Sequence, residues 1–212
     1  MRRGRGAGRA VPRFAGALSL NATLIAQGAD AVAQAELQAR LQDWRPELTG
    51  TLVFVLDTSS PKPRVLLIDK KTGHGAGKIN APGGKLEPDE SPLQCAQREV
   101  YEEVGLRVAH ARLAAELKFV DIQAPQWFGY AFVADEFAGV PKETREARPF
   151  WCDLDALPYA RMWEDDRFWL PLILPTPEAA PVAAGQKVAG EFLFTRGKLL
   201  AYRCYVRSAA CA

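Results

Sequence analysis

Three glutamates follow an arginine at a spacing that could serve metal chemistry. Glu99, Glu102 and Glu103 come directly after Arg98. On a helix, these three carboxylates fall within about 100° of arc. Like charges so placed repel one another, which suggests that a cation lies among them. Mg²⁺ is usually held by such oxygen ligands together with water and substrate phosphates.

The surrounding residues predict the helix that would carry these side chains. Ser91, Pro92 and Gln94 have the types and order of an N-cap, a first-turn proline and a capping-box partner. Gly105 suits the left-handed residue that ends a helix. An apolar stripe at helical spacing would anchor this helix on a core and consists of Leu93, Ala96, Val100 and Val104.

The segment from Gly84 to Leu106 resembles the Nudix box at each of its nine constrained positions. The pattern is a glycine, five residues, Glu90, seven residues, Arg98-Glu99, an aliphatic residue, any residue, Glu102-Glu103, any residue, Gly105 and an aliphatic residue. The resemblance implies a loop–helix–loop that holds Mg²⁺, or Mn²⁺ in its place, against the diphosphate of a nucleotide. It also implies a single-domain α/β fold, an α/β/α sandwich around a mixed sheet.

The resemblance assigns roles to the acidic residues. Glu99, Glu102 and Glu103 would be metal ligands, with Glu146 an additional glutamate at the metal site. Either Glu102 or Glu103 would activate the attacking water, and the sequence leaves that choice open. Arg98 would orient the glutamates by pairing with Glu90 or with one of them.

Further segments resemble the MutT-homologue branch of this family, which hydrolyses oxidised purine nucleoside triphosphates such as 8-oxo-dGTP. By that resemblance, Asn80, Asp165 and Asp166 hydrogen-bond the purine edge and Trp163 stacks on the base. The remaining candidate substrate-binding residues are Thr51, Lys70, Gly83 and Gly84. The glycine pair would let the backbone approach phosphate. His74 and Ile79 depart from the branch, which has phenylalanine and tryptophan at these positions.

Asp165 and Asp166 suit base reading on physical grounds. Two neighbouring carboxylates in an apolar pocket cannot both ionise cheaply, so one becomes a neutral donor while the other stays an acceptor. A pair that exchanges these roles can read more than one oxidised purine. Adjacent acids also occur at helix N-termini, where they complement the helix dipole, and the sequence alone does not separate the two readings.

The remaining chain predicts strands around this site and an N-terminal extension. Residues 1–45 are expected to be a basic, disordered extension, 46–207 the Nudix domain and 208–212 a short tail. The extension has five arginines before its first acid, Asp30, and a short helix is possible from Asp30 to Leu41. Strand-like runs cover 51–56, 64–68, 113–121, 127–134, 148–152, 191–194 and 199–206.

Composition narrows the choice of partners. From Asp30 onward, acids outnumber bases by three, which does not favour nucleic-acid binding. The four cysteines show no metal-ligand spacing, and the apolar run near the N-terminus is too short for a membrane span. We expect a cytoplasmic monomer that binds a small nucleotide, without a membrane or a stable nucleic-acid partner.

Several other functions fit the metal box alone. ADP-ribose, dinucleoside polyphosphates and capped RNA are alternative substrates, and the cluster of Trp163, Asp165 and Asp166 favours purine triphosphates over them. A nucleotide sensor without turnover would not need the full set of glutamates. RNA binding through the basic extension would be strongly weakened by salt.

Overall fold

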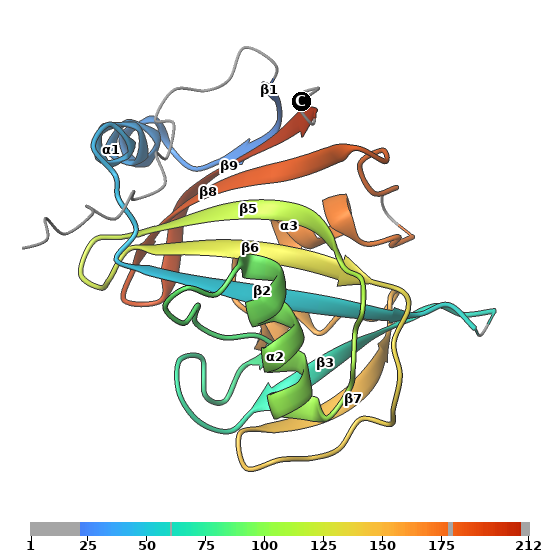
Figure 1. Ribbon diagram of the computed structural model, residues 1–212. Coiled ribbons are helices and arrows are strands. Elements are labelled where there is room, and N and C mark those ends of the chain that lie inside the picture. The colour runs from blue at the N-terminus through green and yellow to red at the C-terminus, as the bar shows by residue number, and fades with distance from the viewer. Residues whose placement is uncertain (1–21, 60, 178–179, 209–212) are drawn as a thin grey trace, which may run out of the picture.

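The computed structural model describes residues 22–59, 61–177 and 180–208, and these build one mixed sheet with helices on both faces (Figure 1). The sheet order is β1-β9-β8-β5-β6-β2-β3-β4, with β7 paired to β3. The strands are β1 (Ala22–Gly28), β2 (Leu48–Asp57), β3 (Arg64–Lys70), β4 (Ile79–Asn80), β5 (Arg112–Asp121), β6 (Trp127–Ala134), β7 (Ala147–Asp153), β8 (Gln186–Thr195) and β9 (Lys198–Ser208). The helices are α1 (Ala31–Leu41), α2 (Pro92–Val104), the 3₁₀ turn η1 (Tyr159–Arg161) and α3 (Asp166–Ile173).

Parallel and antiparallel pairings alternate across the centre of the sheet. Strand β2 runs parallel to β6, and β5 runs parallel to β8. The remaining pairs are antiparallel, including the β2–β3 and β8–β9 hairpins that the sequence predicts. The mixed sheet and both hairpins are therefore confirmed.

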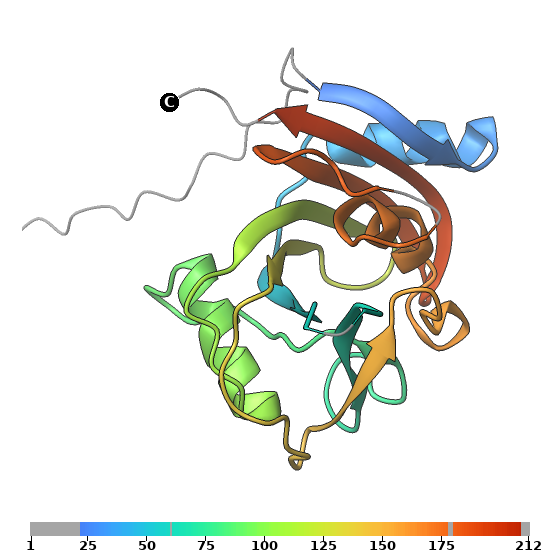
Figure 2. The same ribbon diagram turned by 90° about the vertical axis from the view of Figure 1, so that its right-hand side faces the viewer.

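Alternate residues of β2 face different helices, because successive side chains of a strand point to opposite faces. Val53 and Val55 pack with α2, whereas Phe54 and Leu56 pack with α3. Figure 1 shows α2 in front of the sheet, and Figure 2 shows the two layers from the side. The predicted sandwich is confirmed, and its α2 layer carries the glutamates.

Helix α2 has the ends that the sequence predicts. Ser91 accepts a hydrogen bond from the Gln94 N–H, and the Gln94 side chain accepts one from the Ser91 N–H. Gly105 ends the helix at φ 75°. The prediction that Leu93 belongs to the buried apolar stripe is wrong. Leu93 lies in the first turn of α2 and is exposed. Its three partners in the stripe are buried.

The prediction of a disordered extension over residues 1–45 is wrong for residues 22–45, which the structure describes. Strand β1 pairs antiparallel with β9 from Ala22 to Gly28, and α1 follows, as the possible helix after Asp30 predicted. Leu37 of α1 is fully buried in a cluster that includes Val120 and Leu193. These residues belong to the fold because they add an edge strand and cover apolar sheet surface. Residues 1–21 and 209–212 lie outside the described chain.

Candidate active site

Arg98 gathers the carboxylates of the acidic face. Its Nε and Nη2 atoms each donate to one oxygen of Glu90 at 2.9 Å, which is a bidentate pair. Its Nη1 donates to Glu99 at 2.7 Å and to Glu102 at 3.1 Å. Both pairings that the sequence allowed for Arg98 are present. One arginine thus fixes three acids, and its hydrogen bond lowers the pKa of the Glu90 carboxyl.

Glu103 points away from this group and is buried. One of its oxygens accepts a hydrogen bond from Lys70 Nζ at 2.7 Å, and the other accepts one from the Gly83 N–H at 2.9 Å. The predicted substrate residues Lys70 and Gly83 are therefore linked to α2 through one carboxylate. By contrast, the Glu102 side chain is 58% exposed.

Glu99 lies against the glycine loop. A Cβ on Gly84 would collide with the Glu99 carboxylate, so a larger residue there would displace this side chain. Burial raises the pKa of Glu99, and its hydrogen bond to Arg98 opposes that rise. The charges of Glu103 and Glu102 add to the rise. A site with this charge balance is suited to a divalent cation, which would relieve the repulsion.

Glu146 lies on an exposed loop that is fastened to α2. Thr144 Oγ1 donates to the Glu103 carbonyl at 3.0 Å, and the Glu146 carbonyl accepts from the Lys71 N–H at 2.8 Å. Across the described ranges, no three His, Cys, Asp or Glu side chains are gathered closely enough to hold a metal ion. The four candidate ligands are thus on neighbouring elements but are not drawn together into one cluster.

The loop before α2 runs beside β2. The Thr51 N–H donates to the Gly84 carbonyl at 2.8 Å, and a Cβ on Gly83 would come within 2.0 Å of the Thr51 carbonyl. Glycine is therefore required at Gly83 for this close approach. The Thr51 hydroxyl is buried, 3.3 Å from Cys95 Sγ on α2. Thr51 of β2 therefore contacts both the glycine loop and α2.

Asp165 and Asp166 are buried side by side at the start of α3. Trp169 Nε1 donates to Asp165 at 3.0 Å, and the Trp163 N–H donates to Asp166 at 3.0 Å. Burial raises the pKa of Asp165 to about 7, and it raises the pKa of Asp166 well above its usual value, with the Asp165 charge adding to the rise. Asp165 is the N-cap residue of α3, but its side chain makes no capping hydrogen bond. Burial therefore favours the protonated form of both carboxyls.

Trp163 adjoins this acidic pair through its N–H bond to Asp166. Lys78, which comes just before β4, lies over it: the Lys78 ammonium is 4.8 Å from the centre of the Trp163 ring and donates to the Met162 carbonyl at 3.2 Å. Asn80, two residues along in β4, is half-buried, and its side-chain oxygen accepts from the Ala81 N–H at 2.8 Å. The structure thus joins Trp163 to the acidic pair, and among the described residues no hydrogen bond links Asn80 to them.

Sequence reasoning missed three aromatic contacts of this region. His74 stacks with Trp163 and also with Trp127. Trp127 was predicted only as the first residue of a strand, and nothing in its neighbours marks it as a site residue. Trp169 follows Asp165 by four residues on the helix, and this spacing could have suggested the hydrogen bond.

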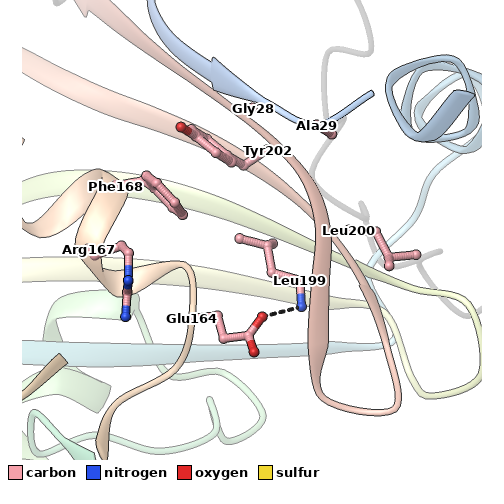
Figure 3. Close-up of a pocket in the computed structure, with 8 residues that line it drawn as sticks. All are labelled: Gly28, Ala29, Glu164, Arg167, Phe168, Leu199, Leu200 and Tyr202. Atoms are coloured by element: carbon pink, nitrogen blue, oxygen red, sulfur yellow. Dashed lines mark hydrogen bonds between the residues drawn. The ribbon is translucent and has the colours of Figure 1, made fainter. Parts of the chain in front are cut away.

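A separate cavity of about 390 Å³ lies between α3 and the edge formed by β1 and β9 (Figure 3). Its lining residues are Gly28, Ala29, Glu164, Arg167, Phe168, Leu199, Leu200 and Tyr202. Glu164 accepts a hydrogen bond from the Leu199 N–H at 2.8 Å, which fastens the segment around Trp163 to β9. None of the predicted site residues lines this cavity, so it is not the candidate active site.

Comparison with known protein families identifies the family to which this chain belongs. The model of the Nudix domain matches residues 47–173, which include the glycine loop, α2 and all of α3. The chain belongs to the Nudix family. This assignment confirms the resemblance that the box predicts and identifies the chain as a hydrolase of that family.

Relatives of this Nudix chain include named enzymes. It is 42% identical over 125 residues to the oxidized purine nucleoside triphosphate hydrolase of Danio rerio, covering 58% of this chain and 78% of the relative. The Mus musculus protein of the same name is 41% identical, with the same coverage. The MutT protein structure from Bacillus halodurans is 27% identical, with a TM-score of 0.61 over 74% of this chain and 97% of that chain.

Membership in the Nudix family implies a divalent metal cofactor and a small nucleotide substrate. The residues fit a hard divalent cation, since the candidate ligands are all carboxylate oxygens and include no histidine or thiolate. Over the described residues, none of the helices has the length and apolar character to cross a membrane.

Proposed function

We propose that this Nudix enzyme hydrolyses purine nucleoside triphosphates, with oxidised purines such as 8-oxo-dGTP as preferred substrates. The products would be the nucleoside monophosphate and pyrophosphate, with Mg²⁺ as cofactor and Mn²⁺ able to replace it. The buried pair Asp165 and Asp166 beside Trp163 carries this proposal, because such a pair can read a purine edge. The names of the relatives from Danio rerio and Mus musculus also support it.

The acidic pair would discriminate by hydrogen bonding. The neutral Asp166 carboxyl donates to an acceptor of the base, and Asp165, held by the Trp169 N–H, accepts from a donor. Oxidation changes the donors and acceptors along the purine edge, so a mismatched base would leave a buried acid unpaired. That loss costs about 1–3 kcal/mol. Asn80 would add a further amide contact and Trp163 a stacking face.

The α2 side would act on the phosphates. Gly83 and Gly84 let the backbone approach them, and Lys70 supplies a nearby positive charge. Glu99, Glu102 and Glu146 would hold the divalent cation, and Glu103, the fourth predicted ligand, would have to exchange its bond to Lys70 or to the Gly83 N–H for one to the metal. When bound, that ion would neutralise phosphate charge and make water more acidic.

Glu102 is the better candidate for the general base. Its carboxylate is largely exposed and, among the described residues, accepts a hydrogen bond from Arg98 alone, whereas both Glu103 oxygens are engaged by Lys70 and Gly83. Glu102 would accept the proton as the water oxygen forms its bond to phosphorus. The bond between that phosphorus and the bridging oxygen then breaks, and pyrophosphate leaves. Arg98 would hold Glu102 and Glu99 in place during this step.

We also propose that the enzyme acts as a cytoplasmic monomer. The excess of acids beyond the N-terminal segment and the three buried free cysteines, Cys95, Cys152 and Cys204, support this view. The same charge balance supports a small-molecule substrate without a stable nucleic-acid partner. Light scattering of the purified protein at several concentrations would test the oligomeric state.

A pyrophosphate-release assay with Mg²⁺ tests the proposed reaction. The substrates are 8-oxo-dGTP, 2-oxo-dATP, dGTP and ADP-ribose, and Glu102→Gln is the control variant. We expect oxidised purines to be hydrolysed with the highest kcat/KM and Glu102→Gln to lose turnover while it still binds nucleotide. Hydrolysis of ADP-ribose alone would overturn the substrate assignment, and full activity of Glu102→Gln would overturn the role of the α2 carboxylates.

A further inference from the structure

The cavity between α3 and the edge formed by β1 and β9 is built largely outside the part of the chain that matches the Nudix model. Of its eight lining residues, only Glu164, Arg167 and Phe168 lie within the matched residues 47–173. The other five come from the end of β1, the residue after it and β9. Its volume of about 390 Å³ falls in the range of about 300–1,000 Å³ that small-molecule sites occupy. The cavity is therefore a candidate for a second ligand site, separate from the candidate active site.

The middle of this cavity is apolar. Phe168 of α3 stacks on Tyr202 of β9, with ring centres 3.9 Å apart and an interplanar angle of 15°. A Cβ on Gly28 would collide with the Tyr202 ring, so a larger residue there would displace the ring. Both rings are half-buried, as is Leu199, which faces the same cavity (Figure 3). These three side chains therefore leave apolar surface on which an apolar group of a ligand can pack.

Two opposite charges, Glu164 and Arg167, lie toward one end of the cavity (Figure 3). One oxygen of Glu164 accepts from the Leu199 N–H at 2.8 Å, and within the described part of the chain the other oxygen accepts no hydrogen bond. Arg167 makes neither an ion pair nor a hydrogen bond with any described residue. It also lies in the first turn of α3, where the helix dipole disfavours a positive charge. Both charged groups are therefore available to a ligand, and an anionic group at Arg167 would offset the unfavourable dipole.

We propose that this cavity binds a free α-amino acid with a large apolar side chain. Arg167 holds the carboxylate of the ligand, Glu164 accepts hydrogen bonds from its ammonium group, and its side chain packs on Phe168, Tyr202 and Leu199. The two charges of the cavity sum to zero, so a zwitterion complements both of them. A simple anion would meet the Glu164 carboxylate and a simple cation the Arg167 guanidinium, and like charges brought together disfavour binding. This inference does not rest on the proposed function.

A series of matched ligands tests each part of the proposed recognition. Titration calorimetry of the purified full chain, without nucleotide, measures the affinity for L-phenylalanine. The comparison ligands are 3-phenylpropionate, which lacks the ammonium group, phenethylamine, which lacks the carboxylate, and L-alanine, which lacks the large side chain. We expect saturable binding of phenylalanine, and roughly ten-fold or greater weakening for each comparison ligand, because each loses a charged hydrogen bond or the apolar contact. No saturable binding of phenylalanine, or equal affinity for 3-phenylpropionate, would overturn the inference.

Two conservative variants place the ligand in this cavity. Glu164→Gln keeps an oxygen that can accept from the Leu199 N–H but removes the charge, and Arg167→Met keeps a long side chain without the guanidinium. Each should weaken phenylalanine binding roughly ten-fold, with an unchanged circular dichroism spectrum.

Two further variants serve as controls for this placement. Arg145→Met, at an exposed arginine outside the cavity, and Glu99→Gln, in the candidate active site, should both bind phenylalanine as the wild type does. Unchanged binding in both cavity variants would overturn the inference. A loss of binding in Glu99→Gln would do the same, because it would place the ligand in the candidate active site. Since no substrate is turned over, these results stand apart from the outcome of the pyrophosphate-release assay.

Discussion

The protonation of Asp165 and Asp166 connects the burial of two residues with the recognition of a base. Both carboxyls lie in the core beside Trp169, where water cannot stabilise their charge. Hydrogen bonds from Trp169 and from backbone N–H groups oppose the rise in pKa without cancelling it. The free enzyme therefore holds protons that the unfolded chain would release at neutral pH.

This retained proton gives a pH dependence of stability. The pKa of Asp165 is raised from 3.8 to about 7, so the folded state binds more protons than the unfolded state between these values, and stability falls as pH rises through this range. Asp165→Asn should remove much of the fall, on the order of a few kcal/mol. Urea unfolding at pH values from 4 to 8 measures the free energy of unfolding of both proteins. Asp135→Asn, at an exposed aspartate, is the control. Parallel profiles for wild type and Asp165→Asn would contradict the prediction.

Lys70 and Glu103 form the buried ion pair that joins β3 to α2. Removing one partner of a buried pair leaves an uncompensated charge, which costs about 3–5 kcal/mol. Lys70→Met should therefore destabilise the protein by several kcal/mol in urea unfolding. Lys71→Met removes the adjacent exposed pair with Glu143 and should change stability by less than about 1 kcal/mol. Equal effects of the two variants would mean that the Glu103 carboxylate does not depend on Lys70.

At the scale of elements, α2 is specified almost completely by its own residues. Ser91, Gln94 and Gly105 define its ends through contacts within four residues, so the sequence predicts its bounds. The closing hairpin of β8 and β9 is predictable for the same reason, since its turn and strands are adjacent. The parallel pairing of β2 with β6 is not, because it joins segments about 80 residues apart and no local pattern records the partner.

The cap of α2 gives a prediction at this scale. Ser91→Ala removes the acceptor for the Gln94 N–H and should destabilise the protein by about 1 kcal/mol. Ser91→Asp should remain close to the wild type, because aspartate is an equally good N-cap. Thermal unfolding of the three proteins measures the difference. A loss in the aspartate variant as large as in the alanine variant would show that the hydroxyl acts in some way other than capping.

Part of the candidate site was predictable because some of its residues lie on one helix, close together in the sequence. The glutamates of α2 lie on one short helix, and the family resemblance predicted that Arg98 pairs with them, as it does with Glu99 and Glu102. The stack of His74, Trp127 and Trp163 depends on three elements meeting in space, and no residue pattern announces it. Likewise, the engagement of Glu103 by Lys70 and Gly83 depends on where β3 and the glycine loop end. Sequence therefore predicted the contacts within α2 better than the contacts that join separate elements.

At the scale of the whole molecule, the N-terminal strand and helix extend the Nudix sheet beyond the matched residues 47–173. Arg203 of β9 donates hydrogen bonds to Gln34 and Gln38 of α1, which fixes the helix on the sheet. Below it, Leu37 meets apolar residues of β5 and β8. Strand β9 would otherwise be the edge of the sheet, with unpaired backbone groups facing solvent. The segment therefore completes the sheet at one side and covers a core cluster.

This role predicts that the N-terminal segment contributes to global stability. Leu37→Ala should destabilise the protein by about 2–5 kcal/mol, because it removes a fully buried side chain from a packed cluster. Val32→Ala, on the same helix but 79% exposed, is the matched control and should change stability by less than about 0.5 kcal/mol. Urea unfolding followed by circular dichroism would show a lower midpoint for Leu37→Ala in a single transition, since α1 unfolds together with the sheet. A separate early transition, or equal stability of the two variants, would instead show that α1 unfolds independently and that the domain beyond it is stable without this helix.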